Sequence, residues 1–415
     1  MNKTRLLAQA VKTAAPEINQ AQTSKKNQAL KQIAEQLLKR QNEILKANQE
    51  DLERAEKNGM PKPMLDRLLL DEKRIKGISD AVLELVEKPD PVGTVVDGSI
   101  RPNGLSITKV RVPLGVVGII FESRPNVSVD AATLCLKAGN AVVLRGGKEA
   151  ISSNQALVTI MRDAIAAVGL PKDGIGLIED TSRESANEMM KLSGILDVLV
   201  PRGGAGLIRS VVENATVPVI ETGTGNCHIY VHQQANLTMA VEIAFNAKVS
   251  RPSVCNAAES LLVDRAVAET FLPMIWEKFQ KAGVTLYGCP ASRAILPEIE
   301  PASEEDYGTE YLDYKMSVKV VEDLHQALNE IAKYSTGHSE AIVTDSVEAA
   351  ECFLRRVDSA AVYVNASTRF TDGGMFGYGA EIGISTQKLH ARGPMGLNEL
   401  TSVKYQIRGN GQIRE

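Results

Sequence analysis

Apolar side chains recur at helical spacing in the first part of the chain. Between Ser24 and Leu45 they stand three and four positions apart, separated by Lys, Gln and Glu, which is typical of a helix with one buried face. Residues 67–87 repeat the pattern. We therefore expect helices that pack on a domain, the first of them capped by Thr23 or Ser24.

Short runs with a β-strand composition follow these helices. Val95-Val96 and residues 105–110 flank Asn103-Gly104, and Asn-Gly between two such runs is a strong hairpin signal. A hairpin between helical regions often projects outward, where its unpaired edges seek a partner strand. Residues 402–407 form a further β-prone run near the end of the chain.

Strand and helix patterns alternate from Val112 to Glu221, and the alternation resumes between Thr238 and Asn365. This order is typical of parallel sheets with helices on both faces. The buried strands expected in the first region are 116–121, 141–145, 174–178, 198–200 and 217–220. Since 415 residues exceed one ordinary core, we predict an α/β protein of two or more domains.

Composition narrows the classes of function. A net charge of -4 gives no sign of a nucleic-acid partner, and no run approaches the roughly 18 apolar residues that a membrane span needs. The five cysteines are scattered without a CxxC pair, so neither a disulfide framework nor a zinc site is indicated. The N-terminal segment lacks the apolar core of a signal peptide. We expect a cytoplasmic protein that binds no metal, nucleic acid or membrane.

Two glycine clusters follow expected strands, although no GxGxxG motif is present. Gly146-Gly147 precedes Lys148, and Gly203-Gly204 opens a helix. Such turns either bind phosphate through backbone N–H groups and a helix N-terminus, or are tight turns that need a positive φ. Two clusters in one sheet leave both interpretations open.

Cys255 and Glu221 are the candidate catalytic side chains. Cys255 leaves the polar loop 250–253 and enters an apolar run, where Arg251 is placed to lower a thiol pKa or to hold an anion. The alternative for Cys255 is a small buried hydrophobe. Glu221 opens a glycine-rich segment at the carboxyl end of a strand, where α/β sheets bind ligands. The alternative for Glu221 is a solvated residue in an interdomain linker.

Longer motifs carry a family resemblance. The order of PLGVVGII, AGNAVVL, ETG and Cys255 resembles the aldehyde dehydrogenase superfamily. Within it the chain resembles the gamma-glutamyl phosphate reductase family over about residues 20–407, on the segments FESRPNV, SRPSVCNA, GTEYLDY, NASTRF, FGYGAEIGIS and HARGPMGL. The resemblance implies two parallel-sheet α/β domains, a small β oligomerisation domain and a homodimer or homotetramer. The implied parts are a cofactor-binding domain at 1–94 and 111–224, a catalytic domain at 225–375, an oligomerisation arm at 95–110 and 395–415, and a segment at 376–394 that returns to the active site and cofactor domain.

The resemblance also assigns roles residue by residue. Cys255 aligns with the catalytic nucleophile, and Glu310 aligns with the glutamate that holds the nicotinamide ribose. Arg145 stands where the family has a cofactor-binding lysine. Gly203 and Gly204 fall in the turn on the phosphate side of the cofactor.

Two positions depart from the superfamily pattern. Aldehyde dehydrogenases have an oxyanion-supporting asparagine where ungapped alignment gives Arg124 here, with Asn126 two residues later. Either side chain, together with backbone N–H groups near Cys255, is a candidate oxyanion partner. Glu221 matches the residue that activates water in hydrolytic members, whereas a reductase should exclude hydrolysis, so its role stays open.

The implied reaction is the second step of proline biosynthesis from glutamate. NADPH-dependent reduction converts L-glutamyl 5-phosphate into L-glutamate 5-semialdehyde and phosphate through a thioester at Cys255. The alternatives are a hydrolytic aldehyde dehydrogenase and a non-catalytic cofactor-binding scaffold. A glutamate 5-kinase is a candidate partner. The candidate substrate-binding residues are Arg124, Arg251, Asn365 and Ser367, with His390 and Arg392 as further candidates near the active site.

Two cations indicate a preference for NADPH over NADH. Three residues beyond the position of Arg145, many NAD-using members carry a glutamate that binds the adenosine ribose, and this chain has Lys148 there. Two positive side chains attract a 2′-phosphate that a carboxylate would repel. The alternative is that Lys148 is a solvated residue at a helix start, where it opposes the helix dipole.

Overall fold

The chain divides into two compact units in this computed structural model, which describes residues 2–414. Unit 1 comprises the chain up to Glu221, the segment Gly377–Gly383 and the chain from Met395 onwards; unit 2 comprises Thr222–Phe376 and Ile384–Pro394. The segment 376–394, expected as a single return segment, is therefore divided between the two units. Cys255 and Glu310 belong to unit 2.

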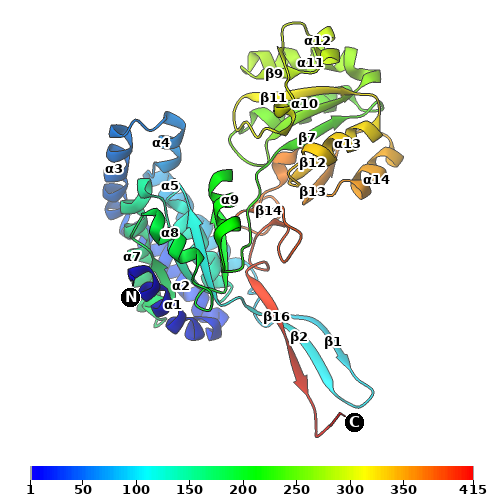
Figure 1. The fold of residues 1–415 in the computed structure, drawn as a ribbon. Coiled ribbons are helices and arrows are strands. Elements are labelled where there is room, and N and C mark those ends of the chain that lie inside the picture. Colours follow the sequence, from blue (N-terminus) through cyan, green and yellow to red (C-terminus); the bar gives the residue numbers. More distant parts are fainter. Residues whose placement is uncertain (1, 415) are drawn as a thin grey trace. The chain divides into compact units, whose positions relative to one another are not determined.

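A four-stranded parallel sheet with the order β5-β4-β3-β6 lies at the centre of unit 1 (Figure 1). Its strands are β3 (Val116–Phe121), β4 (Ala141–Arg145), β5 (Ile175–Leu177) and β6 (Val198–Arg202). Each of them matches a predicted buried strand. The prediction of a full strand at 217–220 is wrong, because only a single bridge joins Val219 to Leu199. Pro218 has no N–H for a regular ladder.

Helices surround this sheet, and the long helix predicted over 24–45 is two helices. They meet at Arg40, whose guanidinium bonds Glu43 (2.7 Å) and Asp163 (3.0 Å) and so fixes the break. The helices of unit 1 are α1 (Lys3–Gln20), α2 (Thr23–Lys39), α3 (Gln41–Lys57), α4 (Lys62–Leu68), α5 (Glu72–Glu87), α6 (Asn126–Lys137), η1 (Lys148–Ala150), α7 (Ile151–Ala167), η2 (Lys172–Gly174), α8 (Arg183–Met190) and α9 (Ala205–Asn214).

The predicted hairpin is confirmed and forms part of a three-stranded antiparallel arm. Strands β1 (Val95–Ile100) and β2 (Ser106–Pro113) are joined around Gly104, which has a φ of +88°. The last strand of the chain, β16 (Thr401–Arg408), pairs with the other edge of β2 (Figure 1). Every residue of β1 is exposed. The outer strand β1 therefore presents its side chains to solvent.

Unit 2 is built on a seven-stranded parallel sheet with the order β10-β9-β11-β8-β7-β12-β13. The strands are β7 (Cys227–Val231), β8 (Ala258–Asp264), β9 (Thr285–Gly288), β10 (Glu300–Pro301), β11 (Lys315–Val321), β12 (Ser339–Val343) and β13 (Ala361–Val364). The helices are α10 (Leu237–Val249), α11 (Arg265–Lys281), α12 (Pro290–Ile295), η3 (Glu305–Gly308), α13 (Leu324–Tyr334), α14 (Val347–Arg356) and η4 (Thr368–Phe370). A short antiparallel pair, β14 (Ile384–Ser385) and β15 (Gly393–Pro394), completes the unit.

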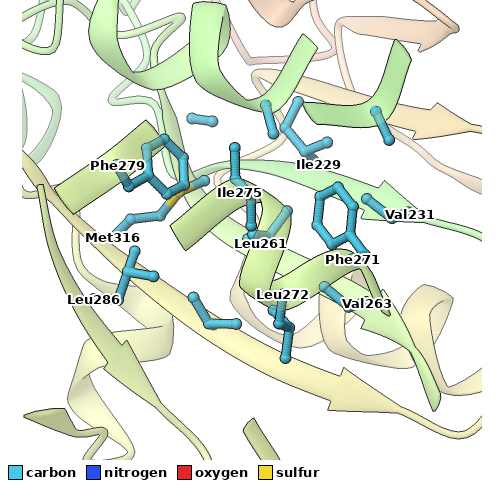
Figure 2. Packing of buried hydrophobic residues seen from close by; sticks show 14 of the residues in the cluster. Ile229, Val231, Leu261, Val263, Phe271, Leu272, Ile275, Phe279, Leu286 and Met316 are labelled. Atoms are coloured by element: carbon cyan, nitrogen blue, oxygen red, sulfur yellow. The ribbon is translucent and has the colours of Figure 1, made fainter. Parts of the chain in front are cut away.

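The core of unit 2 fixes the strands that lead to Cys255. Phe271, Ile275 and Phe279 stand one helical turn apart on α11 and are fully buried against the sheet. Figure 2 shows them facing side chains of the central strands, among them Ile229 of β7 and Leu261 of β8. Burial of a side chain of this size contributes about 1.5–3 kcal/mol. The central strands are thus a rigid base for the loops at their ends.

Candidate active site

Cys255 lies in the loop between α10 and β8, three residues before β8 begins. A turn closes the loop, since the Ala257 N–H donates to the carbonyl of Val254 (3.0 Å). Cys255 is half-buried, whereas Cys135, Cys227 and Cys289 are buried. A nucleophile must be reachable, and the half-buried position of Cys255 is compatible with that role.

Gly225 contacts both Cys255 and Glu310. Its N–H donates to Glu310 Oε1 at 2.7 Å. A Cβ at this position would overlap the backbone carbonyl of Cys255, so only glycine fits there. The same carbonyl accepts a hydrogen bond from Cys227 Sγ at 3.2 Å. Backbone packing at one glycine thus holds the candidate nucleophile and the candidate ribose-binding carboxylate in one arrangement.

The carboxyl group of Glu310 keeps an oxygen available for a ligand. Burial raises the pKa of Glu310, while the Gly225 hydrogen bond and the charge of Lys248 lower it. No residue between 2 and 414 donates a hydrogen bond to Oε2, so this atom can accept one from a ribose hydroxyl. The chemistry of Glu310 therefore fits the role that the family resemblance implies.

A buried ion pair supports the backbone just after Glu310. Lys248 and Glu259 are fully buried and lie 2.5 Å apart, and burial raises the pKa of Glu259. The other carboxylate oxygen accepts the N–H of Leu312 at 3.1 Å, and Leu312 has a φ of +54°. No pattern in the sequence had predicted this pair. Its signal was an acidic residue, Glu259, within the apolar run that forms β8.

The N-terminus of α9 offers backbone donors for phosphate. Within residues 2–414, no acceptor bonds the N–H groups of Ala205 and Gly206, and a Cβ at Gly204 or Gly206 would meet open space. The N–H of Gly204 already donates to the carboxylate of Glu122 (3.0 Å). The first amides of a helix bind anions readily, so this turn fits the phosphates of a dinucleotide.

The two cations expected near the adenosine ribose differ in their surroundings. Arg145 Nη2 donates to the carbonyls of Thr181 (2.7 Å) and Ser182 (2.9 Å), and burial lowers the pKa of Arg145. Lys148 is exposed at the start of η1, without an ion pair to any residue between 2 and 414. The neighbouring Glu149, which the sequence analysis did not consider, accepts the Ser123 N–H at 2.7 Å. Of these two cations, Lys148 is therefore the one whose side chain is exposed to solvent.

The candidate oxyanion residues and Glu221 lie in unit 1. Asn126 begins α6, and its Nδ2 donates to Asp130 at 2.9 Å, which fixes the amide. Burial raises the pKa of Asp130 to about 6. Arg124 is half-buried two residues before α6. Glu221, also half-buried, is the last residue of the long N-terminal segment of unit 1.

Most of the C-terminal candidates form contacts that support the backbone. The side chain of Asn365 bonds both the N–H and the carbonyl of Thr344, each at 2.9 Å. Ser367 Oγ accepts the N–H of Arg369 at the start of η4. Arg392 Nη2 donates to the carbonyl and to the carboxylate of Asp358, each at 2.8 Å. Arg251, in contrast, is exposed and has no carboxylate partner among residues 2–414.

Two global properties concern other classes of site. No helix within residues 2–414 is long and apolar enough to cross a membrane. The same part of the chain contains no group of three or more His, Cys, Asp or Glu side chains with the geometry of a metal site.

The chain belongs to the aldehyde dehydrogenase family, whose model matches residues 3–287. It is 59% identical to the gamma-glutamyl phosphate reductase of Clostridium perfringens over 403 residues, which are 97% of each chain. The crystal structure of gamma-glutamyl phosphate reductase from Thermotoga maritima superposes with a TM-score of 0.98 at 49% identity, over the whole of both chains. An acetylating aldehyde dehydrogenase from Geobacillus thermoglucosidasius, 17% identical, has a TM-score of 0.71 over 100% of this chain and 98% of its own. The predicted fold and family resemblance are confirmed.

Proposed function

We propose that this enzyme reduces L-glutamyl 5-phosphate to L-glutamate 5-semialdehyde with NADPH, as the second step of proline biosynthesis from glutamate. The observation that carries the proposal is the common contact of Cys255 and Glu310 with Gly225. This contact occurs in a chain that is similar to gamma-glutamyl phosphate reductases over almost its whole length.

Cys255 performs the covalent chemistry in this proposal. Its thiolate attacks the acyl carbon of the substrate, the C–O bond to phosphate breaks, and a thioester forms. The thioester accepts hydride far better than a carboxylate does, and NADPH supplies that hydride when it is bound. The resulting oxyanion is stabilised by backbone N–H groups near Cys255, with Asn126 or Arg124 as side-chain candidates. Collapse of the oxyanion re-forms a carbonyl, expels the thiolate of Cys255 and releases the semialdehyde.

The residues that would hold the cofactor are two backbone amides, a carboxylate and a lysine. The amides of Ala205 and Gly206 bind its phosphates, and Glu310 Oε2 accepts a hydrogen bond from the nicotinamide ribose. Lys148 attracts the 2′-phosphate, which gives the preference for NADPH, because Arg145 is already bonded to backbone carbonyls.

The reverse reaction tests the function. The purified protein, given glutamate 5-semialdehyde and NADP⁺, should reduce the cofactor only when inorganic phosphate is present, because phosphate must release the acyl group from Cys255. Full cofactor reduction without phosphate would identify a hydrolytic aldehyde dehydrogenase in which Glu221 activates water. No cofactor reduction under either condition, with cofactor still bound, would favour the non-catalytic scaffold.

A further inference from the structure

The turn that carries Arg369 is bonded to the residue next to Cys255. Thr368 Oγ1 donates to the carbonyl of Asn256 at 2.7 Å. In return, Asn256 Nδ2 donates to the carbonyls of Thr371 (2.9 Å) and Arg369 (3.3 Å). Asn256 is only 4% exposed, so these bonds are sheltered from water. The position of Arg369 is therefore coupled to the loop that holds the nucleophile.

The side chain of Arg369 reaches the other end of the same loop. Its Nε donates to Ser250 Oγ at 3.0 Å, five residues before Cys255. Neither Nη1 nor Nη2 donates a hydrogen bond to a residue between 2 and 414. The guanidinium is thus oriented by one of its N–H groups, and its two terminal nitrogens are left for an external acceptor.

Arg251 places a second positive charge at this loop. No carboxylate between residues 2 and 414 lies within ion-pair distance of Arg251 or Arg369. Burial lowers the pKa of Arg369, and the charge of Arg251 lowers it further, while Asp372 and Cys255 oppose the shift. Two like charges held close to one another repel, and an anion bound between them removes that repulsion.

We infer that Arg369, together with Arg251, binds the phosphate group of the acyl phosphate substrate. The inference rests on the proposed function and adds a residue to it. The phosphate is bonded to the carbon that Cys255 attacks, so its binding group must lie next to the loop of the nucleophile, whereas the substrate's α-carboxylate is at the far end of the molecule. The planar guanidinium presents paired donors that match phosphate oxygens. These donors also stabilise the charge that phosphate takes with it as the leaving group.

The reverse reaction separates the two anionic groups, because phosphate and the carboxylate-bearing semialdehyde are then different substrates. In Arg369→Gln, the KM for phosphate should rise by about 10- to 100-fold, the effect of losing a charged hydrogen bond. The KM for the semialdehyde should change little. Arg369→Lys should give an intermediate KM for phosphate. Arg356→Gln, which alters an exposed arginine of α14, is the matched control and should leave both constants unchanged.

A binding measurement keeps the inference independent of turnover. Inorganic phosphate should raise the Tm of the wild-type protein, and Arg369→Gln should lose most of that rise. Equal phosphate-induced shifts in wild type and variant would overturn the inference, as would a raised KM for the semialdehyde with an unchanged KM for phosphate. Absence of any phosphate-dependent activity in the wild type would instead refute the proposed function, and the Tm comparison would still decide whether Arg369 binds phosphate.

Discussion

The exposure of Cys255 leads to a prediction at the scale of single residues. Cys255→Ala should abolish reduction of the acyl phosphate and leave NADPH binding intact, because only the covalent step is removed. Steady-state assays and a fluorescence titration with NADPH measure the two properties. Cys352, the other half-buried cysteine, is the control. Cys352→Ala should keep most activity, and substantial turnover in Cys255→Ala would refute the assignment of the nucleophile.

Lys148 carries the second prediction at this scale. Lys148→Glu should raise the KM for NADPH by about tenfold or more, because a carboxylate replaces the cation near the 2′-phosphate. The KM for NADH should stay the same or fall. Lys191→Glu, at another exposed lysine of unit 1, should affect neither constant. If the two cofactors weaken equally in Lys148→Glu, Lys148 serves the fold or the shared pyrophosphate instead.

Cys255 and Lys148 could be predicted from the sequence, whereas the tertiary contacts around the candidate nucleophile could not. Cys255 lies within a motif that is contiguous in the chain, and motifs of this kind are visible without a fold. The contact of Gly225 with Cys255 depends on β7 and β8 lying side by side. Arg369 likewise approaches Ser250 only through tertiary packing. Such pairings depend on distances in space, which the order of residues alone does not contain.

At the scale of elements, the buried pair between α10 and β8 makes a measurable contribution. Lys248→Met should lower the free energy of unfolding by about 3–5 kcal/mol, because Glu259 then stays buried without its cationic partner. Replacing both residues, as Lys248→Met with Glu259→Leu, should recover most of the loss. Urea denaturation measures each variant. The exposed pair of Lys278 with Glu242 is the comparison, and Lys278→Met should cost less than about 1 kcal/mol.

A full loss in the double variant, equal to that of Lys248→Met, would contradict this account. It would show that the pair is required for folding in a way that apolar replacements cannot supply.

The element scale also shows where sequence patterns were sufficient. The Asn103-Gly104 hairpin and the four strands of the sheet in unit 1 followed from local chemistry, whereas the break at Arg40 also involves Asp163, a residue of a distant helix.

At the scale of the whole molecule, the arm predicts self-association. Its outer strands expose large apolar side chains, among them Ile100 (78% exposed), Tyr405 (62%) and Ile407 (60%). Such a surface is typical of an interface, and we propose a homo-oligomer formed through it. Shortening residues 99–106 to a tight turn should give a monomer in light scattering. An unchanged mass would mean that the hairpin is not the interface.

The pairing of β2 with β16 has a consequence for the folding of the chain during its synthesis on the ribosome. Translation delivers β1 and β2 before unit 2, whereas β16, which covers the second edge of β2, emerges only after unit 2. All of unit 2 is synthesised in the interval. During that time β2 presents unpaired backbone groups to other nascent chains, a template for misassembly. We therefore expect a chain that is truncated before residue 401 to aggregate, even though it contains all the strands of both parallel sheets.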